Sequence, residues 1–117
     1  MTARVDAAPE VPTGVVEFRD RGGGRFEILG ELTFQTAVAA LDRSRILFAR
    51  HSVIDLDLAG VARADSAGLA LMLECVNWAR NHVRDLRFHN IPAQVISIAQ
   101  ISEVEDMLGR AARWTGA

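Results

Sequence analysis

The chain has 117 residues, a formal net charge of −2 and a composition that is half hydrophobic, which suits one domain with a buried core and is too short for two. All of its basic residues are arginine, so it lacks the lysine that a Walker A phosphate loop or a Schiff-base enzyme requires. A net acidic chain without a basic run also argues against nucleic-acid binding as the main role.

The cysteine content and hydropathy of the chain indicate the cellular compartment in which we expect it. Cys75 is the only cysteine, so the chain forms no internal disulfide and no cysteine-based zinc site. The first residues include Asp6 and Glu10 without the apolar core of a secretory signal. No apolar run approaches the roughly 18 residues of a membrane span. We therefore expect a cytoplasmic protein without direct membrane insertion, which reaches a membrane only through a partner.

The first third of the chain predicts a flexible tail and a β-hairpin. Residues 1–14 are small, polar and twice interrupted by proline, which is typical of a flexible N-terminal tail. Residues 15–20 and 26–32 read as two strands joined by the turn "RGGGR". A glycine-rich phosphate loop would open a helix, whereas this one leads into a strand, so we interpret it as a hairpin turn.

A helix and a strand are expected next. Thr33 is a plausible N-cap for a helix that runs to about Arg50. The residues at helical spacing that are expected to face the core are Phe34, Ala37, Val38, Leu41, Arg45 and Phe48. In the strand that follows, Ile54, Leu56 and Leu58 alternate with Asp55 and Asp57. This period of two indicates a sheet with one face buried and one face wet, and therefore helices mainly on one side.

The remaining elements complete an α/β sandwich of roughly four strands. They are a helix over 66–82, a strand over 85–90, a helix over 91–101 and a last helix over 102–114. Pro92 falls near the first turn of its helix, where a missing N–H is tolerated. Ser102 and Glu105 have the spacing of a capping box for the last helix. The predicted order is β-β-α-β-α-β-α-α.

The stretch "GVARADSAGLALMLE" at residues 60–74 places Asp65 and Ser66 where a strand turns into a helix. Either residue can serve as N-cap, because a side-chain oxygen there satisfies a free backbone N–H. Capping leaves Gly68 unexplained, and a glycine in the first turn lets another backbone approach or leaves amides open around an anion. The alternative is that Ser66 is a phosphorylated switch site, favoured by the helix dipole and opposed by Asp65.

The helix after this junction carries two apolar stripes where a surface helix needs one. The stripe expected to face the core consists of Leu69, Met72, Leu73, Val76 and Val83. The second consists of Leu71, Cys75 and Trp78, flanked by Ala67 and His82. The second stripe either packs on a neighbouring helix or forms an exposed interface for a partner protein, in which tryptophan is a favoured anchor.

The sequence gives little support to catalysis or to a cofactor. His51, His82 and His89 are scattered and lack metal-ligand spacing. A serine-hydrolase elbow, G-x-S-x-G, would need glycine where Ala64 stands, and no histidine is placed as the base for Ser66. We therefore expect a protein that is not an enzyme and binds neither a metal nor a cofactor.

The stretch "DLAGVARADSAGLALMLE" resembles the signature of the STAS domain, the family of bacterial anti-sigma factor antagonists and transporter-linked modules. Asp57, Asp65, Ser66 and Gly68 stand where its pattern of an acidic strand end followed by D-[ST]-[AGS]-G expects them. The resemblance covers roughly residues 15–113, so a STAS domain is expected over 15–117. It implies a mixed sheet, and it places Ser66 at the residue that a partner kinase phosphorylates in the antagonists.

Within the family, "EILGELTFQTAVAAL", "DSAGLALMLE" and "NIPAQVISIAQISEVEDML" look most like the small STAS subunits of Mla phospholipid ABC transporters. That resemblance implies a subunit that binds the cytoplasmic ATPase, and through it the permease, at the inner membrane. The residues expected to bind the partner are Asp65, Ser66, Ala67, Gly68, Leu71, Cys75 and Trp78. The alternative is an anti-sigma factor antagonist regulated by phosphorylation of Ser66.

Overall fold

The computed structural model describes residues 13–104 and 112–114. They contain a sheet with the strand order β1-β2-β3-β4-β5 and three helices. The strands are β1 (Val16–Gly22), β2 (Arg25–Leu32), β3 (Val53–Ala64), β4 (Asp85–His89) and β5 (Ala112–Trp114), and the helices are α1 (Ala37–Phe48), α2 (Ser66–Asn81) and α3 (Ala93–Ile101). The expected flexible tail falls almost wholly on residues 1–12, outside the described part.

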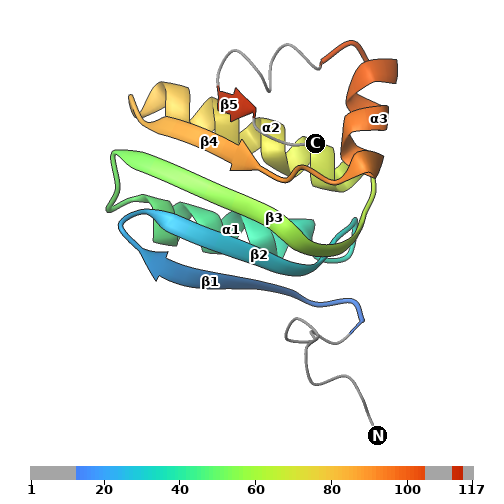
Figure 1. Ribbon diagram of the computed structural model, residues 1–117, viewed down its shortest axis with the longest axis horizontal. Helices are drawn as coiled ribbons and strands as arrows, with labels where there is room; N and C mark the ends of the chain where they lie inside the picture. The colour runs from blue at the N-terminus through green and yellow to red at the C-terminus, as the bar shows by residue number, and fades with distance from the viewer. Residues whose placement is uncertain (1–12, 105–111, 115–117) are drawn as a thin grey trace, which may run out of the picture.

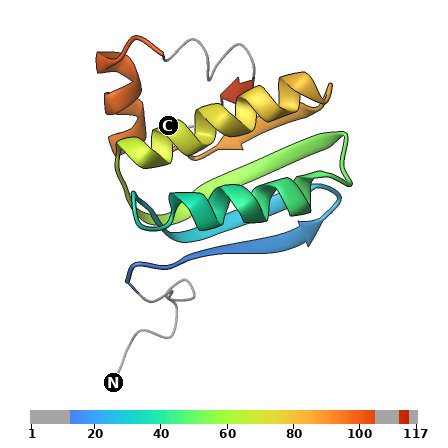
Figure 2. The ribbon, with the colours of Figure 1, turned by 180° about the vertical axis from the view of Figure 1, so that it is seen from behind.

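The sheet is mixed, as the sequence predicts. β1 and β2 form an antiparallel hairpin, and β2, β3, β4 and β5 run parallel to one another. Figures 1 and 2 show α1 and α2 side by side on one face of the sheet, with α3 standing at one end. The opposite face of the sheet is not covered by any described helix. The predicted α/β sandwich, with helices mainly on one side, is confirmed.

The alternation in β3 produces this one-sided cover. Ile54, Leu56 and Leu58 are at most 1 % exposed and belong to the hydrophobic core under the helices. Asp55 and Asp57 point to the open face, where water can solvate them. No helix in the described part of the chain is long and apolar enough to cross a membrane.

The predicted start and orientation of α1 are wrong. The helix begins at Ala37, because Thr33 to Thr36 form a separate turn in which the Ala37 N–H donates to Thr33 O at 2.9 Å. Phe34 and Val38, expected in the core, are 84 % and 73 % exposed.

The buried face of α1 differs from the predicted one and contains small residues. The buried residues of the helix are Ala40, Ser44 and Phe48. The Ser44 hydroxyl donates to Leu41 O at 2.7 Å, which satisfies it inside the protein. The hydrophobic periodicity predicted the wrong buried face because apolar residues occur on all sides of this helix.

The predicted helix over 102–114 is also wrong at both of its described ends. Ser102 is the C-cap of α3, its N–H donates to Ile98 O at 3.0 Å, and Glu103 has a φ of 59°. A residue in that left-handed conformation ends a helix. Residues 112–114 form β5, a short fifth strand on β4. The predicted capping residue Glu105 lies outside the described residues.

Candidate functional site

The junction between β3 and α2 lies beside the turn between β2 and α1. β2 and β3 are parallel neighbours that end in register, with Leu32 paired to Ala64. The Asp65 N–H donates to Leu32 O at 3.2 Å, which extends the pairing by one residue. Two chain segments far apart in sequence therefore leave the sheet together and lead into the two helices that cover it (Figure 2).

Asp65 links these two turns through its side chain. One carboxylate oxygen, Oδ1, accepts from the Ala67 N–H at 2.8 Å and caps α2. The other, Oδ2, accepts from the Phe34 N–H at 3.3 Å across the gap between the turns. The predicted cap is confirmed for Asp65, and the second bond gives the carboxylate a role that a cap alone does not need.

Gly68 is required by close packing. A Cβ at this position would lie 2.6 Å from Leu32 O and 3.1 Å from Leu32 Cβ. Gly68 is buried, so its missing side chain lets the first turn of α2 press against the end of β2. Of the two explanations that the sequence offers for this glycine, the close approach of another backbone is the one the structure supports.

Ser66 is the first residue of α2 and is exposed, while Ala67 beside it is half-buried. The serine hydroxyl can therefore be reached by a second protein without unfolding the helix. Ser66 sits at the positive end of the helix dipole and immediately after the Asp65 carboxylate. Both influences that the sequence predicts for a phosphate at this position are therefore present.

The second apolar stripe of α2 packs on α1. Leu71 and Cys75 are each 5 % exposed, and the Cys75 Sγ lies 3.9 Å from the Ser44 Oγ of α1. The ring of Trp78 is half-buried and its centroid lies 6.1 Å from that of Phe48. The interpretation of this stripe as an exposed patch is wrong for Leu71 and Cys75. Because α2 packs on α1 as well as on the sheet, it needs two apolar stripes.

The far end of α2 departs from the prediction in another way. Val83, expected in the core stripe, is 89 % exposed with a φ of 56°, because the helix ends at Asn81. Trp78 is stacked on His82 with ring centroids 4.6 Å apart, and the Arg84 guanidinium lies 5.5 Å from the indole. These contacts hold Trp78 from its outer side while Phe48 holds it from within.

Burial raises the pKa of the Cys75 thiol to about 12. Desolvation of the thiolate is the main cause, and the Ser44 hydroxyl offsets part of it. A raised pKa lowers the fraction of reactive thiolate. Together with its burial, this supports a packing role for Cys75.

Phe34 is the surface feature that the sequence analysis missed. Its helical spacing with Leu41 and Phe48 suggested burial, but it lies in the turn before α1 and exposes its ring beside the junction. The signal that could have found it is the pair Thr33 and Thr36, since either threonine can cap a helix. Thr36 occupies the N-cap position without a side-chain capping bond, which leaves Phe34 outside the helix.

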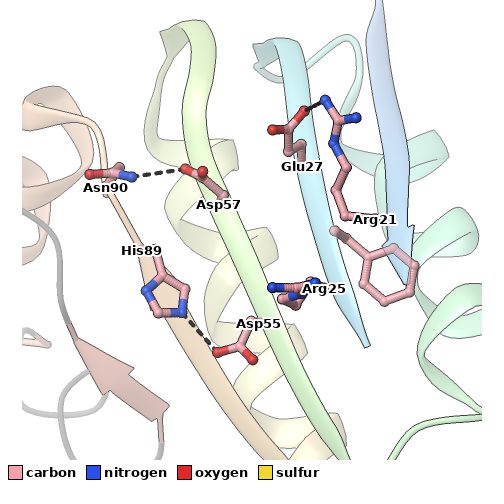
Figure 3. A pocket seen from close by; sticks show the side chains of 8 residues that line it. Arg21, Arg25, Glu27, Asp55, Asp57, His89 and Asn90 are labelled. Carbon is pink, nitrogen blue, oxygen red and sulfur yellow. Dashed lines mark hydrogen bonds and ion pairs between the residues drawn. The ribbon is translucent and has the colours of Figure 1, made fainter. Parts of the chain in front are cut away.

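The open face of the sheet holds a second candidate site. A hollow of about 710 Å³ is lined mainly by polar side chains from β1 to β4 (Figure 3). These lining residues are Arg21, Arg25, Glu27, Asp55, Asp57, His89 and Asn90, together with Phe26. The carboxylates in it are already bonded: Glu27 to Arg21 at 2.7 Å, Asp55 to His89 at 2.8 Å and Asp57 to Asn90 at 3.0 Å.

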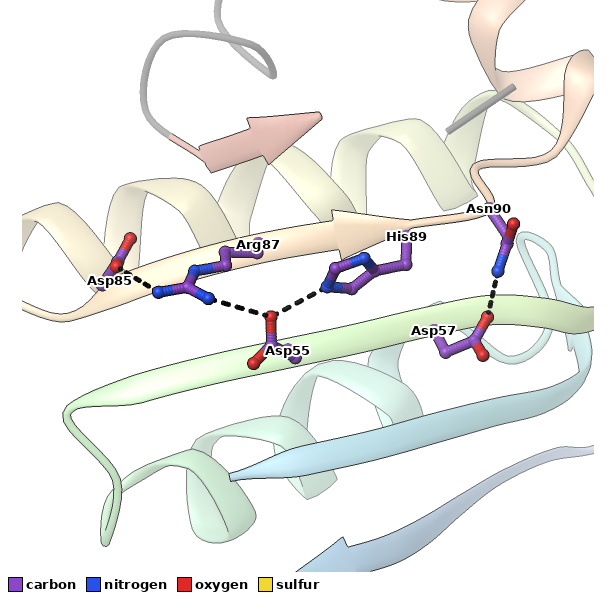
Figure 4. A network of polar contacts seen from close by, with 6 residues as sticks. All are labelled: Asp55, Asp57, Asp85, Arg87, His89 and Asn90. Carbon is purple, nitrogen blue, oxygen red and sulfur yellow. Dashed lines mark hydrogen bonds and ion pairs between the residues drawn. The ribbon is translucent and has the colours of Figure 1, made fainter. Parts of the chain in front are cut away.

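The pairing continues along β3 and β4 (Figure 4). Arg87 lies 3.9 Å from Asp55 and 3.2 Å from Asp85. Strand register creates this pattern, because Asp55 is paired with Arg87 and Asp57 with His89. No group of three or more metal-ligating side chains occurs among the described residues. Each of the three carboxylates in the hollow is therefore bonded to a side chain of the same face.

The sequence matches one described protein family over most of its length. The model of a family described as "Mlab, STAS domain" matches residues 18–109. No curated protein sequence matches the chain significantly.

Among the solved structures that share the fold, two show how widely it is used. The anti-sigma factor antagonist SpoIIAA in its unphosphorylated form matches with a TM-score of 0.62 and 13% identity, covering 86% of this chain and 87% of that one. A sulfate transporter family protein from Wolinella succinogenes matches with a TM-score of 0.61 and 16% identity, covering 96% of this chain and 85% of that one. At these identities the likeness establishes the fold.

Proposed function

The chain belongs to the STAS domain family, and on that premise we propose that it is a non-enzymatic subunit that binds and supports the cytoplasmic ATPase of an Mla-type ABC transporter. Such a transporter moves phospholipid to maintain the lipid asymmetry of the outer membrane. The observation that carries the proposal is that the matching family is the Mlab type of STAS domain. The protein would lie in the cytoplasm, held at the inner membrane by its complex with the ATPase and, indirectly, the permease.

The docking surface in this proposal is the junction at the start of α2. Ser66 and Ala67 would contact the partner, because they are accessible and lie on a fixed helix end. Asp65 and Gly68 would shape the surface, since one bonds both turns and the other lets them pack closely.

The other expected partner residues lie further along α2 and take a supporting role. Leu71 and Cys75 are buried, and Cys75 contacts Ser44 of α1, so they would keep the docking surface in place without touching the partner. Trp78 stays partly exposed, but it is more than three helical turns from Ser66. We assign it to the same packing role.

The second candidate function is an anti-sigma factor antagonist regulated by phosphorylation of Ser66. The observation that favours it is the exposed serine at the N-terminus of α2, in a fold shared with SpoIIAA. Backbone amides at a helix start favour a phosphate, whereas Asp65 repels it. Both functions use the same surface, so only the partner separates them.

Capture from the native host separates the two functions. A tagged chain is expected to recover an ABC ATPase and to raise its stability or activity, while the purified chain alone hydrolyses neither ATP nor esters. Ser66→Asp should weaken capture by about 10-fold or more, because a new charge at a close contact must be desolvated. Ser97→Asp, at an exposed serine of α3, is the matched control and should leave capture unchanged. Recovery of a sigma-regulating kinase without an ATPase would favour the antagonist instead.

A further inference from the structure

An aromatic side chain stands exposed next to the proposed docking surface. Phe34 is 84 % exposed, and Val38, four residues further on, is 73 % exposed. Single exposed apolar residues are common and need no explanation. Phe34 differs from such residues because hydrogen bonds fix its backbone, and one of these bonds is to Asp65 at the junction.

The turn that carries Phe34 is fixed by its own hydrogen bonds. The Thr36 hydroxyl accepts from the Thr33 N–H at 3.0 Å and donates to Glu31 O at 2.6 Å. The Thr36 N–H donates to Thr33 O at 3.0 Å, which closes the turn around Phe34. Thr33 and Thr36 are each 3 % exposed, so these bonds are shielded from water. A turn fixed in this way loses little backbone entropy when a partner binds.

The same turn is bonded to the start of α2. The Asp65 carboxylate accepts from the Phe34 N–H at 3.3 Å and from the Ala67 N–H at 2.8 Å. The backbones of Phe34 and of the residues around Ser66 therefore keep a fixed relation to each other. A protein that covers Ser66 meets the neighbouring turn, and with it the phenyl ring.

The composition of this surface suits a protein interface. Among the exposed residues near Phe34 and Ser66 along the chain, Gln35 and Ala70 are uncharged and Arg63 is charged, and the half-buried Asp65 carboxylate lies between the two turns. Interface centres are enriched in aromatic residues. A rigid, exposed aromatic residue has the properties of an interface anchor.

We propose that Phe34 is the aromatic anchor of the docking surface, inserting its ring into an apolar pocket of the ATPase subunit, and that Asp65 is the residue that positions it. This inference rests on the proposed function, since the occupant is the same partner that covers Ser66. The argument for that occupant is the continuity of the two turns through one carboxylate. Val38 extends the apolar contact along α1.

Binding of the purified ATPase subunit tests the anchor. Phe34→Ala is expected to weaken the affinity about 30-fold, the loss typical of an interface anchor, with an unchanged melting temperature of the free chain. Ile46→Ala is the matched control, because Ile46 is 71 % exposed on α1, which follows the Phe34 turn, and lies near the end of that helix away from the junction. It should change the affinity less than about 2-fold, as contacts outside an interface do.

The role of Asp65 is tested by a double-mutant cycle. Asn is as good an N-cap as Asp, but it has a single oxygen and cannot accept from both amides. Asp65→Asn should therefore weaken binding in the parent chain and add no further loss in Phe34→Ala. An equal loss in both backgrounds would show that Asp65 acts only on the general stability of the helix, and would overturn the positioning role.

The controls separate failure of the inference from failure of the proposed function. If the parent chain does not bind the ATPase, the proposed function fails and the anchor fails with it. If the parent binds and Phe34→Ala binds equally well, only the anchor is overturned. A parent chain that is a dimer in solution and becomes a monomer on Phe34→Ala would instead assign the ring to self-association, which also overturns the proposal.

Discussion

Asp55 lies in β3 and Asp65 directly after it, yet their carboxylates interact with different kinds of groups. Asp55 interacts with side chains of the neighbouring strand, through a hydrogen bond with His89 at 2.8 Å and a long ion pair with Arg87 at 3.9 Å. Asp65 bonds to backbone amides of two turns. Side-chain pairs on a wet sheet face add little stability, whereas bonds to backbone amides fix the path of the chain.

The two regions also differ in what they leave for a partner. On the open face, carboxylates meet cationic or amide groups of the same face, so a second protein would have to replace existing contacts (Figure 4). At the junction, the Asp65 carboxylate and the Thr36 hydroxyl are bonded to the backbone, while Phe34 and Ser66 are exposed. Of these two regions, the junction is therefore the one that offers a partner a large exposed apolar side chain, Phe34.

Truncation of Leu71 tests the claim that the covered side of α2 is structural, and it carries the largest expected effect. Leu71→Ala should lower the free energy of unfolding of the isolated chain by about 3 kcal/mol, through lost burial and the cavity left behind. Urea denaturation measures it. Ile46→Ala, an exposed truncation on α1, should stay within about 0.5 kcal/mol. If Leu71→Ala lowered the free energy of unfolding only slightly and abolished partner binding, Leu71 would be an interface residue.

Much of this arrangement could be predicted because strand periodicity and the junction motif are local signals. The alternation from Ile54 to Leu58 gave the buried and wet faces of β3, and the motif around Asp65 gave the start of α2. The second bond of Asp65, to Phe34, could not be predicted. It depends on the parallel register that brings residues 31 positions apart together.

The errors have physical reasons of the same kind. In α1, apolar residues occur all round the helix, so its orientation was set by small residues that allow close packing and not by hydrophobic spacing. At Ser102, a sequence suited to a helix start falls on the C-cap of α3, and the left-handed backbone of Glu103 does not continue into a new helix. In both places tertiary packing decided between two local patterns of similar strength.

Alkaline titration tests the buried side of α2, with an effect of intermediate size per pH unit. The Cys75 thiol has a pKa of about 12 when folded, against an ordinary value of 9.0, so between these values the folded chain keeps a proton that the unfolded chain loses. The free energy of unfolding should therefore be unaffected by this group below pH 9 and fall above it by about 1.4 kcal/mol per pH unit.

The composition of the chain makes this test unusually clean. The chain contains no tyrosine and no lysine, so no other type of side chain ordinarily titrates between pH 9 and 12. Urea denaturation at a series of pH values should show the slope in the parent and not in Cys75→Ala. The slopes are compared, because the small cavity in the variant shifts the whole curve. The same slope in both chains would mean that the thiol is not desolvated.

The smallest effect is expected on the open face, at Asp55. Asp55→Asn keeps an oxygen that can accept from His89 and removes the charge that faces Arg87, while both partners are about one-third exposed. Ion pairs with that access to water contribute about 0–1 kcal/mol and are screened by salt. The free energy of unfolding should fall by about 0.5 kcal/mol in dilute buffer and by less in 1 M salt, and ATPase binding should not change. A salt-independent loss of more than about 2 kcal/mol in the free energy of unfolding would mean that this network holds β3 to β4. A loss of ATPase binding without a loss of stability would mean that the partner binds the open face and not the junction.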